Sequence, residues 1–192
     1  MSSAARPRTR RPEARPDQIL DAAERLLVAE GAAAMTMDAV AAAADVGKGT
    51  IYHYFRSKAE LLSALRNRYL ARAVARAAQA AELLGGAAMD RVERFVDILL
   101  DSIEANGPLI WVLFHETAIE EDDELAAVYE PLLALVTEGA ENGEFPISDP
   151  AFTTGFILHG LHGTVESAFH SGDVDPGQLK SGLRSAIRAI LR

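Results

Sequence analysis

Hydrophobic residues recur every three or four positions along most of this 192-residue chain, which is the period of amphipathic helices. The first such segment begins at Asp17 and ends at Gly31, a residue type that commonly stops a helix. Thr36 is a favourable N-cap for a second, alanine-rich helix. The sequence Asp45-Val46-Gly47 then predicts a turn, and a third helix follows over about 48–55.

A long fourth helix is predicted from Ser57-Lys58-Ala59-Glu60, which has the pattern of a capping box, to Gly85-Gly86. Helical spacing continues beyond these glycines and predicts five more helices. They cover the stripe from Val92 to Ile103, residues 109–120, a segment that ends near Glu141 and is kinked by Pro131, and residues 150–170 and 176–191, each opened by an Asp-Pro pair. No segment is convincing as a strand, so we predict an all-α fold of about nine helices.

Charge is distributed unevenly along the chain. Residues 1–70 hold 11 Lys and Arg against 8 Asp and Glu, a net charge of +3, whereas residues 71–192 hold 8 against 20, a net charge of −12. The total is −9. This asymmetry indicates a small module that faces nucleic acid, carried on an acidic body that phosphate would repel. Residues 1–16 contain five arginines and three prolines and predict a flexible arm, which either stays solvated or touches phosphate or the minor groove.

The predicted third helix has two chemically different faces. At 100° per residue, Ile51 and Phe55 fall on the side that packs against the first two helices. The opposite side carries chemistry suited to DNA, and Gly49 there has no side chain to hold the backbone away from a groove. The outward groups are Lys48, Gly49, Thr50, Tyr52 and His53, with Tyr54 and Lys58 placed to reach phosphates. A major groove about 12 Å wide admits one such helix, so the segment predicts a DNA-binding helix-turn-helix.

Residues 17–65 resemble the TetR family of bacterial transcriptional regulators. The matching features are Gly31, Thr36 and the run Lys48-Gly49-Thr50-Ile51-Tyr52-His53-Tyr54-Phe55, followed by Lys58 and Glu60. The resemblance implies a homodimer whose third helices enter successive major grooves of a palindromic operator. It also implies a C-terminal domain that binds a small-molecule effector and dimerises through its last two helices. By position, the implied DNA contacts are Thr36, Thr50, Tyr52, His53, Tyr54 and Lys58.

The expected organisation is an arm over 1–16, a helix-turn-helix domain over 17–62 and a helical ligand-binding and dimerisation domain over 63–192. Two residues depart from the family pattern. Asp45 stands where glycine usually begins the turn, and aspartate enters the left-handed region at modest cost. Gly47 stands where serine is common, which removes one hydroxyl for phosphate.

The predicted helix over 150–170 offers an apolar face and a face rich in histidine and small residues. One should meet a partner subunit and the other an effector cavity, and the sequence leaves open which does which. The candidates for the cavity wall are Trp111, Phe114, His115, Phe156 and His159, although the aromatic side chains at 111 and 114 fit a core equally well. His159, His162 and Glu166 also have a spacing that one helix could present to a metal ion, against the simpler reading of hydrogen-bonded histidines.

These patterns together predict a ligand-responsive transcriptional regulator, a repressor by family resemblance, that is released from operator DNA by its effector. A metal-sensing regulator is the alternative. We expect no enzyme, because the chain lacks the nucleophile-elbow, phosphate-loop, dinucleotide and zinc-protease motifs. A protein that coats DNA without specificity needs positive charge over a broad surface. The net charge of −12 over residues 71–192 therefore argues against that class. The chain has no cysteine, no apolar run of membrane-spanning length and no sign of a cofactor, so we expect a soluble, cytoplasmic protein.

Overall fold

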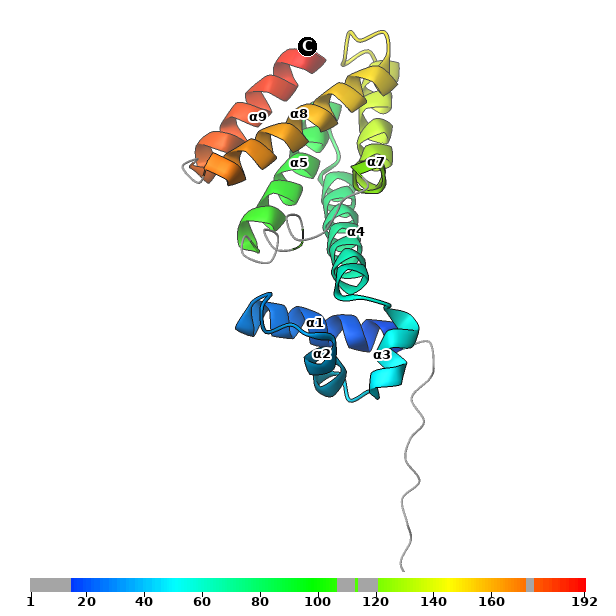
Figure 1. Ribbon diagram of the computed structural model, residues 1–192. Coiled ribbons are helices and arrows are strands. Elements are labelled where there is room, and N and C mark those ends of the chain that lie inside the picture. The colour runs from blue at the N-terminus through cyan, green and yellow to red at the C-terminus, as the bar shows by residue number, and fades with distance from the viewer. Residues whose placement is uncertain (1–14, 107–112, 114–120, 172–174) are drawn as a thin grey trace, which may run out of the picture.

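The structure is a computed structural model that describes residues 15–106, 113, 121–171 and 175–192. Every regular element within these ranges is a helix, as predicted (Figure 1). The helices are α1 (Arg15–Glu30), α2 (Met37–Ala43), α3 (Lys48–Tyr54), α4 (Lys58–Leu84), α5 (Ala88–Ala105), α7 (Glu121–Glu141), α8 (Pro150–Ser171) and α9 (Pro176–Leu191). The helix predicted over 109–120 lies outside the described residues, apart from Leu113.

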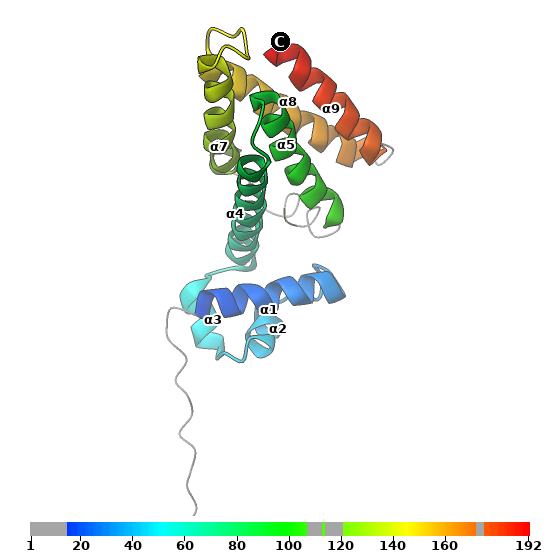
Figure 2. The same cartoon turned by 180° about the vertical axis from the view of Figure 1, so that it is seen from behind.

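The first three helices and the first two turns of α4 form a small unit, which we call the head. Figures 1 and 2 show α1 lying across the end of α4, with α2 and α3 on its far side. The head has its own hydrophobic core, which includes Ile19, Val40, Ile51, Leu61 and Leu65. Leu113, from the segment between α5 and α7, is fully buried in the same core.

Side-chain hydrogen bonds to the backbone hold both ends of α2 in the head. The Thr36 hydroxyl accepts from the backbone N–H of Ala39 at 3.1 Å, which caps α2 as predicted. The Gln18 side-chain amide of α1 donates to the backbone carbonyl of Ala44, so α1 also holds the C-terminal end of α2. This second contact joins residues 26 positions apart and has no local sequence signal.

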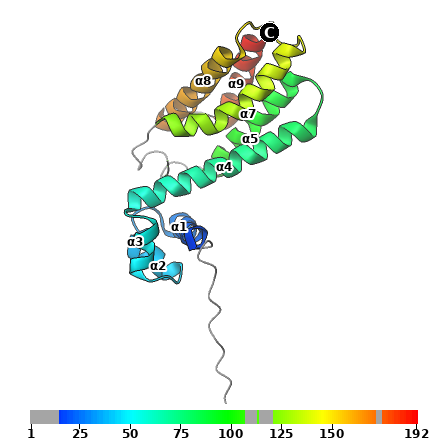
Figure 3. The ribbon, with the colours of Figure 1, turned by 90° about the vertical axis from the view of Figure 1, so that its right-hand side faces the viewer.

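The long helix α4 connects the head to the rest of the molecule. Ser57 caps its N-terminus by accepting from the Glu60 N–H at 3.1 Å, and the Glu60 carboxylate accepts from the Arg56 N–H at 2.7 Å. The predicted capping box is therefore present, with its return bond made to the residue before the cap. Gly85 ends the helix at a φ of 59°, a region that favours glycine. Figure 3 shows α4 running from the head along the full length of the remaining helices.

The remaining helices, α5 and α7–α9 with the C-terminal part of α4, form a second unit that we call the body. Its core is separate from that of the head and includes Val74, Phe95, Leu132, Ile157 and Ile187. In Figure 1, α8 and α9 lie side by side on one side of the body, and α9 also packs against α5. The predicted caps are present, because Asp149 accepts from the Phe152 N–H and Asp175 from the Gln178 N–H, each at 2.9 Å.

Pro131 lies inside α7, and the helix continues past it to Glu141. Among the residues described, none of the helices combines the length and the apolar character that a membrane crossing requires.

Candidate nucleic-acid interface

The third helix of the head presents the two faces that the sequence predicts. Ile51 and Phe55 are buried in the core of the head. Tyr52 is 42% exposed, although it is a large and partly apolar side chain. Lys48, Gly49 and His53 are exposed as well, and Thr50 and Tyr54 are half-buried. The outer face of α3 thus exposes an ammonium group, an imidazole and a phenol, all of which can form hydrogen bonds with a ligand.

Lys48 is joined to the preceding helix by an ion pair. Its Nζ lies 2.9 Å from both carboxylate oxygens of Asp38, which belongs to the first turn of α2. The hydrogen bond to Asp38, followed by the attraction between the two charges, raises the pKa of Lys48. The helical pattern predicts that Lys48 lies on the DNA-facing surface but does not reveal this partner, because Asp38 lies ten residues away across the turn.

Lys58 has a second contact within the head. Its Nζ donates to the backbone carbonyl of Ala32 at 2.6 Å, which links the start of α4 to the turn between α1 and α2. Lys58 is half-buried, and its ammonium has a structural partner within the head. The sequence pattern predicts only a phosphate contact for Lys58 and gives no sign of this backbone partner.

The turn between α2 and α3 sets the position of α3. Asp45 adopts a φ of 52°, as the sequence predicts for an aspartate in place of glycine. Gly47 precedes α3 and provides no side-chain cap. On α3 itself, the rings of His53 and Tyr54 meet edge to face, with centroids 5.2 Å apart and planes at 77°.

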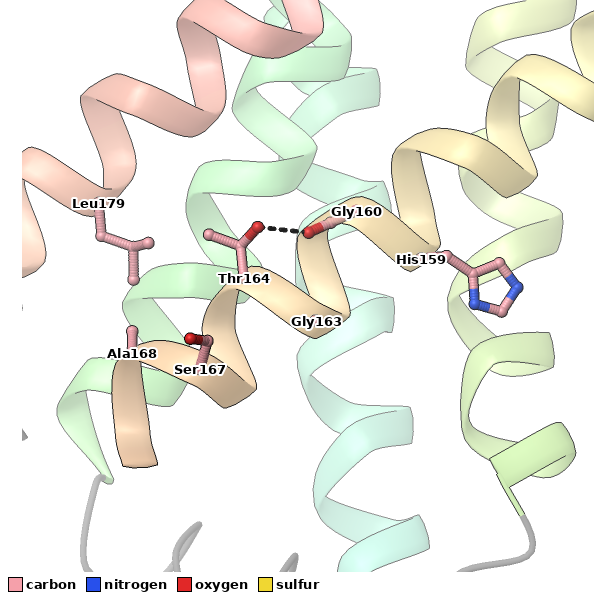
Figure 4. A pocket seen from close by; sticks show the side chains of 7 residues that line it. All are labelled: His159, Gly160, Gly163, Thr164, Ser167, Ala168 and Leu179. Carbon is pink, nitrogen blue, oxygen red and sulfur yellow. Dashed lines mark hydrogen bonds between the residues drawn. The ribbon is translucent and has the colours of Figure 1, made fainter. Parts of the chain in front are cut away.

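Helix α8 carries Phe156 and His159, two of the five residues predicted to form the cavity wall. Figure 4 shows an open pocket between α8 and α9, lined by His159, Gly160, Gly163, Thr164, Ser167, Ala168 and Leu179. The Thr164 hydroxyl donates to the Gly160 carbonyl at 2.6 Å within the helix. His159 is exposed and Phe156 is 61% exposed, so both lie on the outer face of α8. Trp111, Phe114 and His115 lie outside the described residues.

The two faces of α8 are now distinguished by burial. Ile157 and Leu158 are buried in the core of the body, whereas Phe152 and Phe156 point away from it. The described residues hold no group of three or more His, Cys, Asp or Glu arranged for a metal ion. Within the described residues, the alternative that His159, His162 and Glu166 form such a group therefore has no support.

Comparison with known proteins agrees with this geometry. Residues 19–65 match the family described as bacterial regulatory proteins, tetR family. Over 130 residues the chain is 34% identical to the HTH-type transcriptional repressor LfrR of Mycolicibacterium smegmatis, which covers 68% of this chain and 62% of that protein. The chain belongs to the TetR family. It spans about three fifths of LfrR, and the matched family segment contains most of α1, all of α2 and α3, and the start of α4.

Solved structures extend the similarity of this TetR-family chain to its whole fold. A TetR-family transcriptional regulator from Streptomyces coelicolor is 25% identical, with a TM-score of 0.65, and the match covers 92% of this chain and 97% of that one. The fatty acid degradation regulator FadR from Bacillus halodurans is 23% identical, with a TM-score of 0.68 and coverage of 92% and 99%. FadR from Bacillus subtilis, solved in complex with stearoyl-CoA, is 19% identical, with a TM-score of 0.70 and coverage of 92% and 99%. The family is one of regulators, in agreement with the prediction that the chain is not an enzyme.

Proposed function

We propose that this chain is a transcriptional repressor that binds a palindromic operator in the cytoplasm as a homodimer and is released by a small-molecule effector. The observation that carries this proposal is the outer face of α3, where Lys48, Tyr52 and His53 stand exposed beside each other within the segment that matches the TetR family. In this proposal residues 17–62 bind DNA, and residues 63–192 bind the effector and form the dimer. The arm over 1–16 adds positive charge next to the DNA-binding domain.

Base reading is assigned to the exposed polar groups of α3. Thr50, Tyr52 and His53 offer a hydroxyl, a phenol and an imidazole, which donate to or accept from base edges in a major groove. Gly49 allows the backbone to approach the groove closely. Thr36, Lys48, Tyr54 and Lys58 are assigned to phosphates, which position the head without reading sequence.

Dimerisation is assigned to the outer faces of α8 and α9. Phe152 and Phe156 are 72% and 61% exposed and lie one turn apart on the face of α8 that is turned away from the core. Two exposed aromatic side chains that adjoin a run of small residues are typical of a protein interface rather than of a solvated surface. To fit successive half-sites, the two α3 helices of an isologous dimer must lie about 34–36 Å apart, or a multiple of that distance.

Release by a small molecule and the repressor role are supported by the relatives. LfrR is named a repressor, and FadR from Bacillus subtilis was solved with stearoyl-CoA. The latter similarity is one of fold, so we propose an organic effector for this chain without assigning it the same ligand. The effector would favour a conformation in which the two heads no longer match the operator, which requires that it bind the two conformations with different affinity.

The proposal is tested by selecting binding sites from a random duplex library with the full-length protein. We expect a palindromic site, for which the Tyr52→Ala variant loses at least tenfold in affinity at fixed salt, since a good base contact contributes about 1–3 kcal/mol. Val28→Ala, which truncates an exposed apolar side chain on α1, is the matched control and should bind as the wild type does. Light scattering on each variant checks that the molar mass remains that of a dimer.

Two outcomes would contradict the proposal. If no site is enriched and competitor DNA removes all binding, the protein is not a specific regulator. If a site is enriched but both Tyr52→Ala and His53→Ala bind it normally, α3 is not the reading helix.

A further inference from the structure

The ion pair between Asp38 and Lys48 lies on the surface that the proposed function assigns to DNA. Both carboxylate oxygens of Asp38 are 2.9 Å from the Lys48 ammonium, and the two side chains are 64% and 66% exposed. Lys48 and Tyr52 are four residues apart on α3, so they share one face of the helix. A phosphate that approaches Lys48 beside Tyr52 therefore also approaches the negative charge of Asp38.

We infer that Asp38 restrains sequence-independent binding of DNA by this head, because its carboxylate neutralises Lys48 at the edge of the reading face. This inference rests on the proposed function. Asp38 acts here as a repulsive element beside the attractive contacts, which is a general way of limiting unwanted partners.

The physical argument depends on how phosphate attraction works. Sequence-independent affinity comes from cations that neutralise phosphates and release condensed counterions, and each engaged cation contributes about 0.9 to the slope of log K against log salt. A lysine that is already paired with a carboxylate adds little net attraction. Removal of the carboxylate restores one full positive charge to the surface. Genomes offer a very large number of competing sites, so restraint of this background is as important to a regulator as its affinity for the operator.

The ion pair between Asp38 and Lys48 is weak enough that it lowers the affinity of Lys48 for phosphate without preventing contact. Both groups are mostly exposed, and ion pairs in such positions are screened by water and salt. Operator DNA that is held by base contacts can therefore still engage Lys48. No other described contact of the Asp38 side chain competes with this role, since the cap of α2 is made by the hydroxyl of Thr36.

Asp45 supplies a matched control for charge. It is an exposed aspartate in the turn between α2 and α3, and no ion pair is found for it among the described residues. Asn tolerates the left-handed backbone of this position about as well as Asp does. Asp45→Asn therefore removes the same charge from the same part of the head without freeing a lysine.

The test measures binding of full-length wild type, Asp38→Asn, Asp45→Asn and Asp38→Asn/Lys48→Gln to a random-sequence duplex over a range of NaCl concentrations, by fluorescence anisotropy. Asp38→Asn should bind about fivefold more tightly near 0.1 M salt and steepen the salt slope by about 0.9. Asp45→Asn should change affinity less than twofold and leave the slope unchanged. Adding Lys48→Gln should return the Asp38→Asn variant to wild-type affinity or below. A circular dichroism melt of each variant confirms that the head is folded.

Three results would overturn the inference. Equal or weaker binding by Asp38→Asn would mean that Asp38 positions Lys48 for DNA instead of restraining it. An equal gain in Asp45→Asn would mean that only overall charge is important. Persistence of the gain in the double variant would exclude Lys48. If the wild type binds no duplex at any salt, the proposed function itself fails, whereas normal wild-type binding with an unchanged Asp38→Asn variant rejects this inference alone.

Discussion

Asp45 is the residue at which the backbone of the head is most strained. It is the non-glycine residue with positive φ in the described part of the chain, and it completes a Schellman motif at the end of α2. The Asp45 N–H donates to the Ala42 carbonyl at 3.2 Å, and the Val46 N–H donates to the Ala41 carbonyl at 3.0 Å. The position is one that glycine adopts without steric cost, so the aspartate reduces the stability of the turn that orients α3.

Substitution of Asp45 by glycine should therefore stabilise the head. We expect Asp45→Gly to raise the free energy of unfolding by about 0.5–1 kcal/mol, because relief of the left-handed strain outweighs the extra freedom of glycine in the unfolded chain. Asp45→Ala should lower it by a similar amount, since alanine has neither the freedom of glycine nor the local hydrogen bonding of aspartate. Urea denaturation at fixed protomer concentration gives the comparison. A glycine variant less stable than the alanine variant would contradict the assigned strain.

Residue-level features were predictable from sequence where the interaction is local. The caps at Thr36, Ser57, Asp149 and Asp175 each join a side chain to a backbone N–H three residues on, and all four follow from the local pattern. The contacts of Lys48 and Lys58 were missed because their partners lie 10 and 26 residues away. Helical periodicity gives the face on which a lysine lies but does not identify what the tertiary fold brings to that face.

At the scale of elements, α9 is attached to α5 by a ladder of ion pairs. Arg188 pairs with Glu93, Arg184 with Asp97, and Lys180 with both Asp101 and Glu104. Partners recur every four residues on each helix, in opposite order, as expected for antiparallel neighbours. The extent of α9 was predicted closely from Asp175-Pro176, but its pairing with α5 was not, because an acidic stripe on one helix has no sequence mark that identifies its basic partner.

Glu93 makes the stability of this ladder depend on pH. The hydrogen bond from Arg188 lowers the pKa of Glu93 below its ordinary value of 4.5, and the charge of Arg188 adds to this effect. Between the folded and unfolded pKa values the unfolded state binds more protons, so stability rises with pH there. The contribution is present above about pH 4.5 and is lost as pH falls through the folded pKa. Glu93→Gln should lower stability at pH 7 and show a smaller further loss at pH 3.5.

The measurement for this ladder is urea unfolding at the two pH values with protomer concentration held constant. Glu104→Gln is a suitable control, because Lys180 keeps Asp101 as a partner when Glu104 is neutralised. An equal loss of stability on acidification in the wild type and in Glu93→Gln would show that this carboxylate does not contribute to the pH dependence.

At the scale of the whole molecule, two hydrophobic cores are joined by one helix. α4 contributes Leu61, Leu62 and Leu65 to the core of the head and Val74, Ala77 and Ala81 to the core of the body. Leu113 supplies a second connection, because it comes from the segment after α5 and is buried in the core of the head. A change in the body that is to alter the spacing of two heads must act through such connections, since the described cores are otherwise separate.

Arg68 strengthens the connection on the side of α1. Its guanidinium lies 2.7 Å from both Asp21 and Glu24 and is only 12% exposed, so it ties α4 to α1 at the point where α4 leaves the head. Arg72, one turn further along α4, is 59% exposed and lies 3.6 Å from Glu24. The two arginines therefore have the same chemistry and the same neighbour but differ in burial.

Arg68→Ala should loosen the head from α4, and Arg72→Ala should not. We expect the first variant to lose about 1–2 kcal/mol and the second less than about 0.5 kcal/mol, because removal of a mostly buried partner leaves Asp21 and Glu24 facing each other, whereas an exposed pair contributes little. Hydrogen exchange of the α1 amides is the direct measurement, since it reports local opening. Faster exchange in both variants to the same extent would show that burial of Arg68 is unimportant. Faster exchange in Arg68→Ala alone, with the body unchanged, would show that the buried ion pairs of Arg68 hold α1 against α4.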